Sequence, residues 1–176
     1  DKDGHIYDGR SKLLVSTCRF IFNFSIGKII DGPHWCESAA EHGLNFLLNK
    51  HQKKENGSFP WLLKGTEVED STIKTYGQAH VLLALSTAKK ANILNSSKKI
   101  EDIYTQTKKY FWESNHGLCL SELDKNMEES SSYRGQNANM HMCEAMITAY
   151  EATKSNKYLD TAYTIAKKIG KELSEK

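Results

Sequence analysis

Apolar side chains recur at helical spacing through most of the chain. Residues three and four positions apart lie on one face of an α-helix, so this spacing predicts helices with one buried face. The pattern predicts six helices, over residues 11–30, 34–50, 73–91, 97–113, 137–153 and 156–174. Long alternations of Val, Ile and Thr, which are typical of strands, are missing from the sequence. The sequence therefore predicts an all-α fold.

The third and fifth predicted helices repeat one another. The segment YGQAHVLLALSTAKK (76–90) aligns with NANMHMCEAMITAYE (137–151), and this alignment gives His80 and His141 the same repeat position, 61 residues apart. The second and fourth helices align at nearly the same offset. A period of about 60 residues that holds two helices is typical of arrays of α-hairpins.

Arrays of this kind are open solenoids or closed rings. A ring of six hairpins at this period needs about 360 residues. The chain has 176 residues, enough for about three hairpins. Because each repeat buries its faces on its neighbours, a half-ring exposes two raw ends, and we expect the chain to be a piece of a longer protein.

The fifth predicted helix has a narrow polar line among small and apolar positions. The line consists of Asn137, His141, Glu144 and Thr148. An inner helix of a ring packs on both flanks and against the outer layer, so only one narrow face looks into the central cavity. We interpret the polar line as that cavity-facing surface.

The other predicted inner helices carry matching residues. Arg19 lies one repeat before His80 and stands among three phenylalanines. An unpaired buried charge is costly, so an arginine in this setting indicates a function. Tyr76 and His80 form a third line, in which the apolar neighbours of His80 favour a packing role. Arg19 and His141 are therefore the foremost candidates.

Metal and thiol chemistry have less support in the sequence. His141 and Glu144 have the spacing of metal ligands, but a second such motif is missing, so we expect no metal. Glu144 is alternatively the partner of an arginine. The four cysteines are scattered and typical of free thiols in the cytoplasm, and Cys143 has no base on its own face.

Charge and hydropathy limit the partners. The net charge of +2 gives no basis for binding nucleic acid or an anionic membrane. Apolar runs in the sequence stay below the ~20 residues of a membrane span. We expect a cytoplasmic protein with a small-molecule ligand, and the sequence leaves its oligomeric state open.

Three segments together resemble the N-acylglucosamine 2-epimerase superfamily, and its bacterial mannose isomerase and sulfoquinovose isomerase branch in particular. They are DKDGHIYDGRSKLLVSTCRFIFNFS, TYGQAHVLLALS and YRGQNANMHMCEAMITAYEAT. The resemblance implies an (α/α)6 barrel, a toroid of helical hairpins. Residues 1–176 then form its N-terminal half, with about three of the six hairpins present.

The resemblance also implies a chemistry without metal or cofactor. An aldose and a ketose, such as D-mannose and D-fructose, interconvert through a cis-enediol. Arg19 matches the arginine that stabilises the enediolate, while Asn137 and His141 match the pair that holds sugar hydroxyls and assists ring opening. Tyr76 matches a cavity-lining tyrosine, and Glu144 is a further candidate for binding the monosaccharide. The acid/base histidines of the family have no counterpart in the chain.

Other functions remain open at this point. The nearest is a sugar 2-epimerase acting on N-acylglucosamine or a disaccharide. A glycoside hydrolase on an α/α toroid needs paired carboxylates, for which Glu144 is one candidate and Asp70 a weaker one. A non-catalytic helical-repeat scaffold would bind a ligand on the same polar line without turnover.

Overall fold

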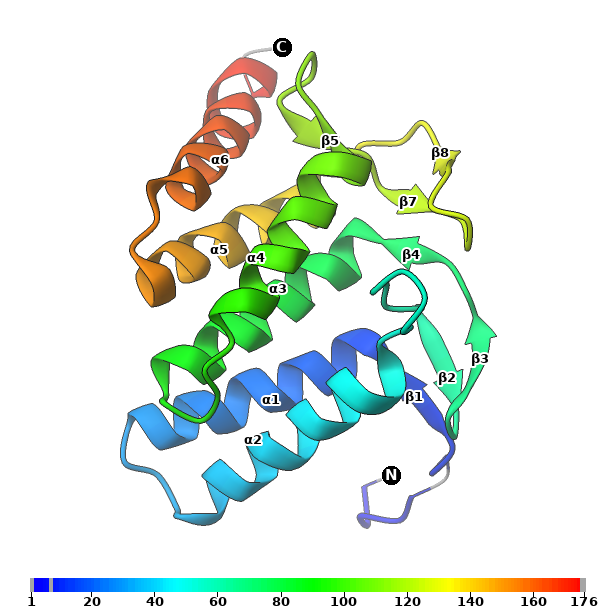
Figure 1. Cartoon of the computed structure of the whole chain (residues 1–176), viewed down its shortest axis with the longest axis vertical. Coiled ribbons are helices and arrows are strands. Elements are labelled where there is room, and N and C mark those ends of the chain that lie inside the picture. The colour runs from blue at the N-terminus through cyan, green and yellow to red at the C-terminus, as the bar shows by residue number, and fades with distance from the viewer. Residues whose placement is uncertain (1, 7, 175–176) are drawn as a thin grey trace.

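A computed structural model describes residues 2–6 and 8–174, most of them in helices. Six α-helices follow one another as three hairpins (Figure 1). They are α1 (Leu14–Ile29), α2 (Trp35–Phe46), α3 (Thr75–Lys90), α4 (Ser97–Gln106), α5 (Gln136–Thr153) and α6 (Asn156–Lys167). Each of the six predicted helices is thus confirmed. None of the described helices is long and apolar enough to cross a membrane.

The second helix of every hairpin continues into a π-helical turn. The three turns are η1 (Leu47–His51), η2 (Thr107–Phe111) and η3 (Lys168–Leu173). They begin 60 and then 61 residues apart, which is the period read from the sequence. Since the same local backbone recurs at one position of each unit, the repeat is a property of the fold as well as of the sequence.

The helices form two layers. α1, α3 and α5 lie side by side, with α3 in the middle, and each of α2, α4 and α6 packs on the inner helix of its own hairpin (Figure 1). Because α3 has neighbours on several sides, it is buried almost throughout, at Thr75 and from Gly77 to Ala88. The flanking inner helices retain exposed apolar side chains, among them Phe20 of α1 and Ile147 of α5.

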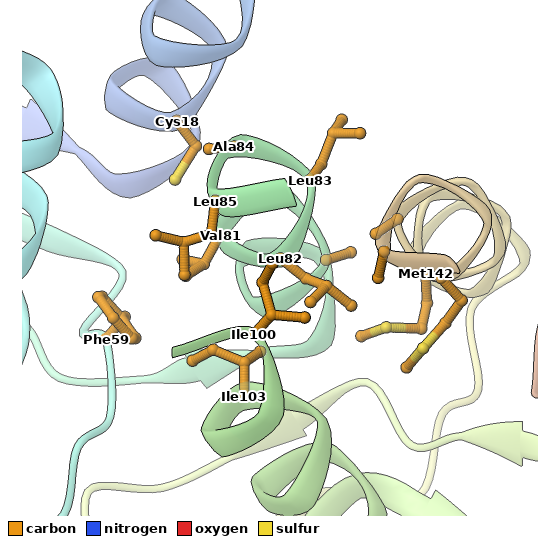
Figure 2. Packing of buried hydrophobic residues seen from close by; sticks show 14 of the residues in the cluster. Cys18, Phe59, Val81, Leu82, Leu83, Ala84, Leu85, Ile100, Ile103 and Met142 are labelled. Atoms are coloured by element: carbon orange, nitrogen blue, oxygen red, sulfur yellow. The ribbon is translucent and has the colours of Figure 1, made fainter. Parts of the chain in front are cut away.

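The core lies between the layers and around α3. Leu82 of α3 points toward Ile100 of α4 (Figure 2), and Leu85, Ile103 and Met142 are buried in the same cluster. Burial of a side chain of this size contributes roughly 1.5–3 kcal/mol. The inner helices that carry the polar lines are therefore held by a continuous apolar core.

Short strands join the hairpins, and the all-α prediction missed them. They form three small antiparallel sheets. These are β1 (Ser11–Leu13) with β2 (Leu62–Lys64) and β3 (Glu67–Asp70), β4 (Ile73–Lys74) with β7 (Glu122–Leu123) and β8 (Glu129–Ser131), and β5 (Trp112–Glu113) with β6 (Leu118–Cys119). Strands of two to four residues are too short to display a period-two pattern in the sequence.

The strands fix the starts of the inner helices. β1 leads into α1 and pairs with β2, while β4 leads into α3 and pairs with β7, at the right of Figure 1. The N–H of Leu14 donates to the carbonyl of Trp61 at 3.1 Å, and that of Thr75 donates to Ser121 at 2.9 Å. The first N–H of a helix has no partner inside the helix, so the loop that follows the same hairpin supplies one.

Candidate active site

Arg19, His80 and His141 occupy the sixth position of α1, α3 and α5. Because these helices lie side by side and start alike, the repeat brings the three side chains to one level. They line a cleft of about 180 Å³ on the inner layer. The lining residues are Cys18, Arg19, Phe22, Asn23, His80, Leu83, His141 and Glu144.

Two side chains of α3 hold the Arg19 guanidinium. Its Nε lies 3.4 Å from Nε2 of His80, and its Nη2 donates to the hydroxyl of Tyr76 at 2.9 Å. A guanidinium is charged at any physiological pH and is planar, so two contacts define its orientation. Arg19 itself is exposed, so the prediction of a buried charge among phenylalanines is wrong, and what holds the guanidinium is its contact with α3.

His80 is buried in the wall of the cleft, with 3% of its surface exposed. Its Nδ1 lies 2.8 Å from the carbonyl oxygen of Tyr76. A carbonyl only accepts, so Nδ1 carries the proton and Nε2 of the neutral ring offers a lone pair to Arg19. Burial is the main cause that lowers the pKa of His80. The packing role expected for His80 is therefore incomplete, because this side chain also faces the cleft and Arg19.

Glu144 lies against His141 rather than against an arginine. Oε2 of Glu144 accepts from Nδ1 of His141 at 2.9 Å, one helical turn along α5. The imidazole is thereby oriented, and in its neutral form Nε2 is the accepting nitrogen. The side chain of His141 is 21% exposed, so a ligand in the cleft can reach it.

Tyr76 joins the two histidines into one cluster. Its ring centroid lies 4.6 Å from that of His80 and 5.1 Å from that of His141, edge-on to the latter. The two imidazoles are 4.8 Å apart. The structure thus brings together four of the five predicted site residues: Arg19, Tyr76, His141 and Glu144.

Asn137 is the predicted site residue that the structure leaves apart. It lies one helical turn before His141, is exposed, and is outside the described set of residues that line the cleft. His80 is the residue that sequence reasoning undervalued. The signal for it was present, since His80 shares one repeat position with Arg19 and His141.

The cleft has limited means for other chemistries. Among its described lining residues, Glu144 alone carries a carboxylate, while Asp70 in β3 accepts from the N–H of Thr72 at 2.9 Å. Burial raises the pKa of the Cys18 and Cys143 thiols, so neither is a ready nucleophile. Residues 2–6 and 8–174 contain no group of three or more His, Cys, Asp or Glu placed to hold a metal ion.

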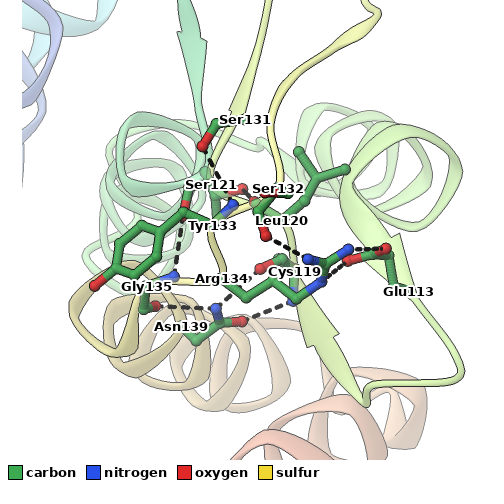
Figure 3. A network of polar contacts seen from close by, with 11 residues as sticks. Glu113, Cys119, Leu120, Ser121, Ser131, Ser132, Tyr133, Arg134, Gly135 and Asn139 are labelled. Atoms are coloured by element: carbon green, nitrogen blue, oxygen red, sulfur yellow. Dashed lines mark hydrogen bonds and ion pairs between the residues drawn. The ribbon is translucent and has the colours of Figure 1, made fainter.

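The start of α5 is held by the buried side chain of Asn139 (Figure 3). Its Oδ1 accepts from the N–H of Cys119 at 2.7 Å, and its Nδ2 donates to the carbonyls of Cys119 at 3.0 Å and Gly135 at 3.1 Å. The amide therefore pairs with the β6 backbone as a neighbouring strand would. Asn139 precedes His141 by two residues, so this pairing sets the position of His141 along the cleft.

A second contact anchors the loop before α5. The guanidinium of Arg134 pairs with both carboxylate oxygens of Glu113 and donates to the carbonyl of Ser132 (Figure 3). Side-on pairing of arginine with carboxylate fixes both groups in one plane. The ion pair therefore ties the loop to β5 immediately before the helix that carries His141.

Comparison with known proteins identifies the family of this chain. The sequence model of the N-acylglucosamine 2-epimerase (GlcNAc 2-epimerase) family matches residues 1–176. The chain belongs to the N-acylglucosamine 2-epimerase family. A D-mannose isomerase of Marinomonas mediterranea (strain ATCC 700492 / JCM 21426 / NBRC 103028 / MMB-1) is 42% identical over 167 residues, which cover 95% of this chain and 42% of that protein. The chain thus spans less than half the length of this relative.

Solved structures in and around the family share the fold. A crystal structure of D-mannose isomerase superposes with a TM-score of 0.92 at 42% identity, covering 97% of this chain and 44% of that one. A sugar epimerase from a ruminal bacterium gives 0.87 at 17% identity, with coverage of 95% and 46%. A glycoside hydrolase family 76 mannosidase of Bacteroides thetaiotaomicron gives 0.74 at 13% identity, with coverage of 90% and 44%, a likeness of fold alone. The family inferred from the sequence segments is confirmed.

Proposed function

We propose that the complete protein is a sugar isomerase that interconverts an aldose and a ketose, D-mannose and D-fructose first among them, through a cis-enediol. One observation carries the proposal. A guanidinium fixed by two hydrogen bonds and an imidazole oriented by a carboxylate meet at one cleft. The 42% identity to a D-mannose isomerase supports the choice of sugar.

Arg19 stabilises the negative charge that develops on the sugar. Removal of the proton alpha to the carbonyl builds negative charge on the sugar oxygens. A fixed cation placed where that charge develops lowers the barrier without reorganising during the reaction. Since Arg19 supplies the positive charge, the mechanism requires no metal and no other cofactor.

His141 acts on the sugar hydroxyls. With Nδ1 bound to Glu144, its Nε2 takes a proton from the anomeric hydroxyl of the cyclic sugar and gives it to the ring oxygen. The ring then opens to the reactive aldehyde form. Tyr76, Asn137 and Glu144 complete the contacts to the monosaccharide. In this proposal Asn137 is reached by a hydroxyl that extends beyond the cleft.

The remaining proton transfers belong to the other part of the protein. The chain forms three hairpins of a six-hairpin (α/α)6 barrel, and the groups that move the proton between C2 and C1 lie on the hairpins that close the ring. Residues 1–176 therefore supply the substrate-binding and charge-stabilising wall. The four free thiols support a cytoplasmic location.

A 2-epimerase is the second candidate, favoured by the family match itself. Both reactions share the enediolate, and they differ in whether the proton returns to C1 or to the opposite face of C2. Hydrolysis has less support, because the cleft lacks a second carboxylate among its described residues.

The test uses the complete protein, expressed from the gene extended to its natural ends. The protein is incubated with D-mannose in D2O, and the sugar is followed by proton NMR. Fructose that carries deuterium is the expected result. Glucose as the first product would replace isomerase by 2-epimerase. Binding of the sugar without deuterium exchange would contradict both and favour a non-catalytic scaffold.

A further inference from the structure

We propose that His80 is a positioning residue, whose neutral imidazole accepts a hydrogen bond from Arg19 Nε and sets the plane of the guanidinium at the substrate. The inference rests on the proposed function, in which Arg19 stabilises the enediolate. It gives a role to a buried histidine that the mechanism above does not use.

The tautomer of His80 follows from its backbone contact. Nδ1 faces the carbonyl of Tyr76 at 2.8 Å, so the proton of the neutral ring resides there. Nε2 is then an acceptor, and the group facing it at 3.4 Å is Nε of Arg19, which only donates. A protonated His80 would set one N–H against another and place two positive charges side by side.

The geometry of Arg19 needs this second contact. The hydroxyl of Tyr76 holds Nη2 at one corner of the guanidinium, and a single hydrogen bond leaves the plane free to rotate about it. The contact to His80 at Nε fixes a second corner. Both partners lie on α3, one helical turn apart, so the buried central helix dictates the orientation of a cation that projects from α1.

A packing role alone is the alternative, and His51 provides the matched control. His51 is also fully buried, and its Nε2 lies 2.7 Å from the carbonyl of Pro60. It belongs to η1 of the outer layer and lies outside the described lining of the cleft. Replacing His51 removes a buried, hydrogen-bonded imidazole without touching Arg19.

The kinetic test compares two amides at position 80 in the complete protein. In H80Q the amide reaches the place of Nε2 and keeps an acceptor for Arg19, whereas H80N reaches only the place of Nδ1. We expect H80N to lower kcat by about 10- to 100-fold with a smaller change in KM, and H80Q to lose at most about fivefold. H51N should lower the melting temperature and leave kcat within about twofold of wild type.

A second readout does not depend on turnover. Nitrogen-15 NMR of histidine-labelled protein should show His80 as the neutral Nδ1–H tautomer, and R19K should shift its Nε2 resonance. Equal kcat losses in H80Q and H80N, or an Nε2–H tautomer, would overturn the proposal. Wild-type protein inactive on every sugar would overturn the proposed function, while the NMR result would still decide whether His80 and Arg19 are joined.

Discussion

His80 and His141 share one repeat position, yet their surroundings differ. His80 lies on the central inner helix, is almost entirely buried, and bonds to a backbone carbonyl and an arginine. His141 lies on α5, has an accessible side chain, and bonds to a carboxylate. The repeat thus places a histidine at the same position of both helices, but the two rings have different hydrogen-bond partners and a different exposure.

The two histidines differ in what their ring nitrogens contact. Both ring nitrogens of His80 contact groups of the protein, so its protonation state is fixed by the fold. The Glu144 carboxylate occupies one nitrogen of His141, and the ring borders the cleft. A repeated residue type therefore does not imply a repeated function.

The largest effect should come from Arg19, which contacts His80 and lines the cleft together with His141. R19K in the complete protein removes the planar fork while keeping the charge, and we expect kcat to fall by about 100- to 1,000-fold. The measurement is isomerisation of D-mannose at saturating sugar. R10K, at an exposed arginine outside the cleft, is the control. Equal activity of R19K and wild type would remove Arg19 from the mechanism.

A smaller but still large effect is expected on the ligand-facing side. H141N keeps a donor for Glu144 and removes Nε2, so kcat should fall by about 100-fold. E144Q keeps an acceptor for the imidazole and should cost about 3- to 10-fold. Steady-state kinetics on ring-closed sugar checks both. A larger loss in E144Q than in H141N would reverse the assigned roles.

The comparison extends to a second pair one repeat apart, Asn139 and Gln78. Asn139 satisfies the Cys119 backbone, so N139A should lower the free energy of unfolding by about 2 kcal/mol. Gln78 is equally buried, and its Oε1 has no hydrogen-bond partner within the described residues. Q78M should therefore cost less than about 1 kcal/mol. Denaturant unfolding of both variants tests this, and equal losses would contradict it.

The smallest effect is the pH dependence of stability. Burial lowers the pKa of both His51 and His80, so the unfolded chain binds protons that the folded one excludes. Their contribution to stability is complete above the unfolded pKa of about 6.5 and is lost as pH falls toward the lowered values. The melting temperature should fall between pH 7 and pH 5, and less steeply in H51Q. A melting temperature that rises over this range would contradict the assignment.

Helical periodicity predicted the six helices and their repeat because long amphipathic segments leave a clear pattern. The strands escaped detection, since two to four residues are ordered mainly by partners distant in sequence, such as β2 beside β1. Their presence corrects the all-α description without changing the order of the hairpins.

The site was predictable in part for the same reason. Repeat alignment brought Arg19 and His141 to one level, and the structure confirms that they line one cleft. The apolar sequence neighbours of His80 concealed its role. Packing of α3 with α1 and α5 decides which side of this buried helix faces the cleft, and the sequence pattern does not show it. The pattern along one helix likewise did not predict that Asn137 is exposed.

The strand pairing at the starts of α1 and α3 has a consequence for how such proteins can be cut and duplicated. α1 and α3 each begin on a backbone partner in the loop that follows their own hairpin. The cooperative module is therefore a hairpin together with the loop that follows its own outer helix, and the modules follow one another along the chain. An internal duplication or a domain graft cut directly after an outer helix severs these pairings. A cut later in the loop, after the pairing strand, preserves them.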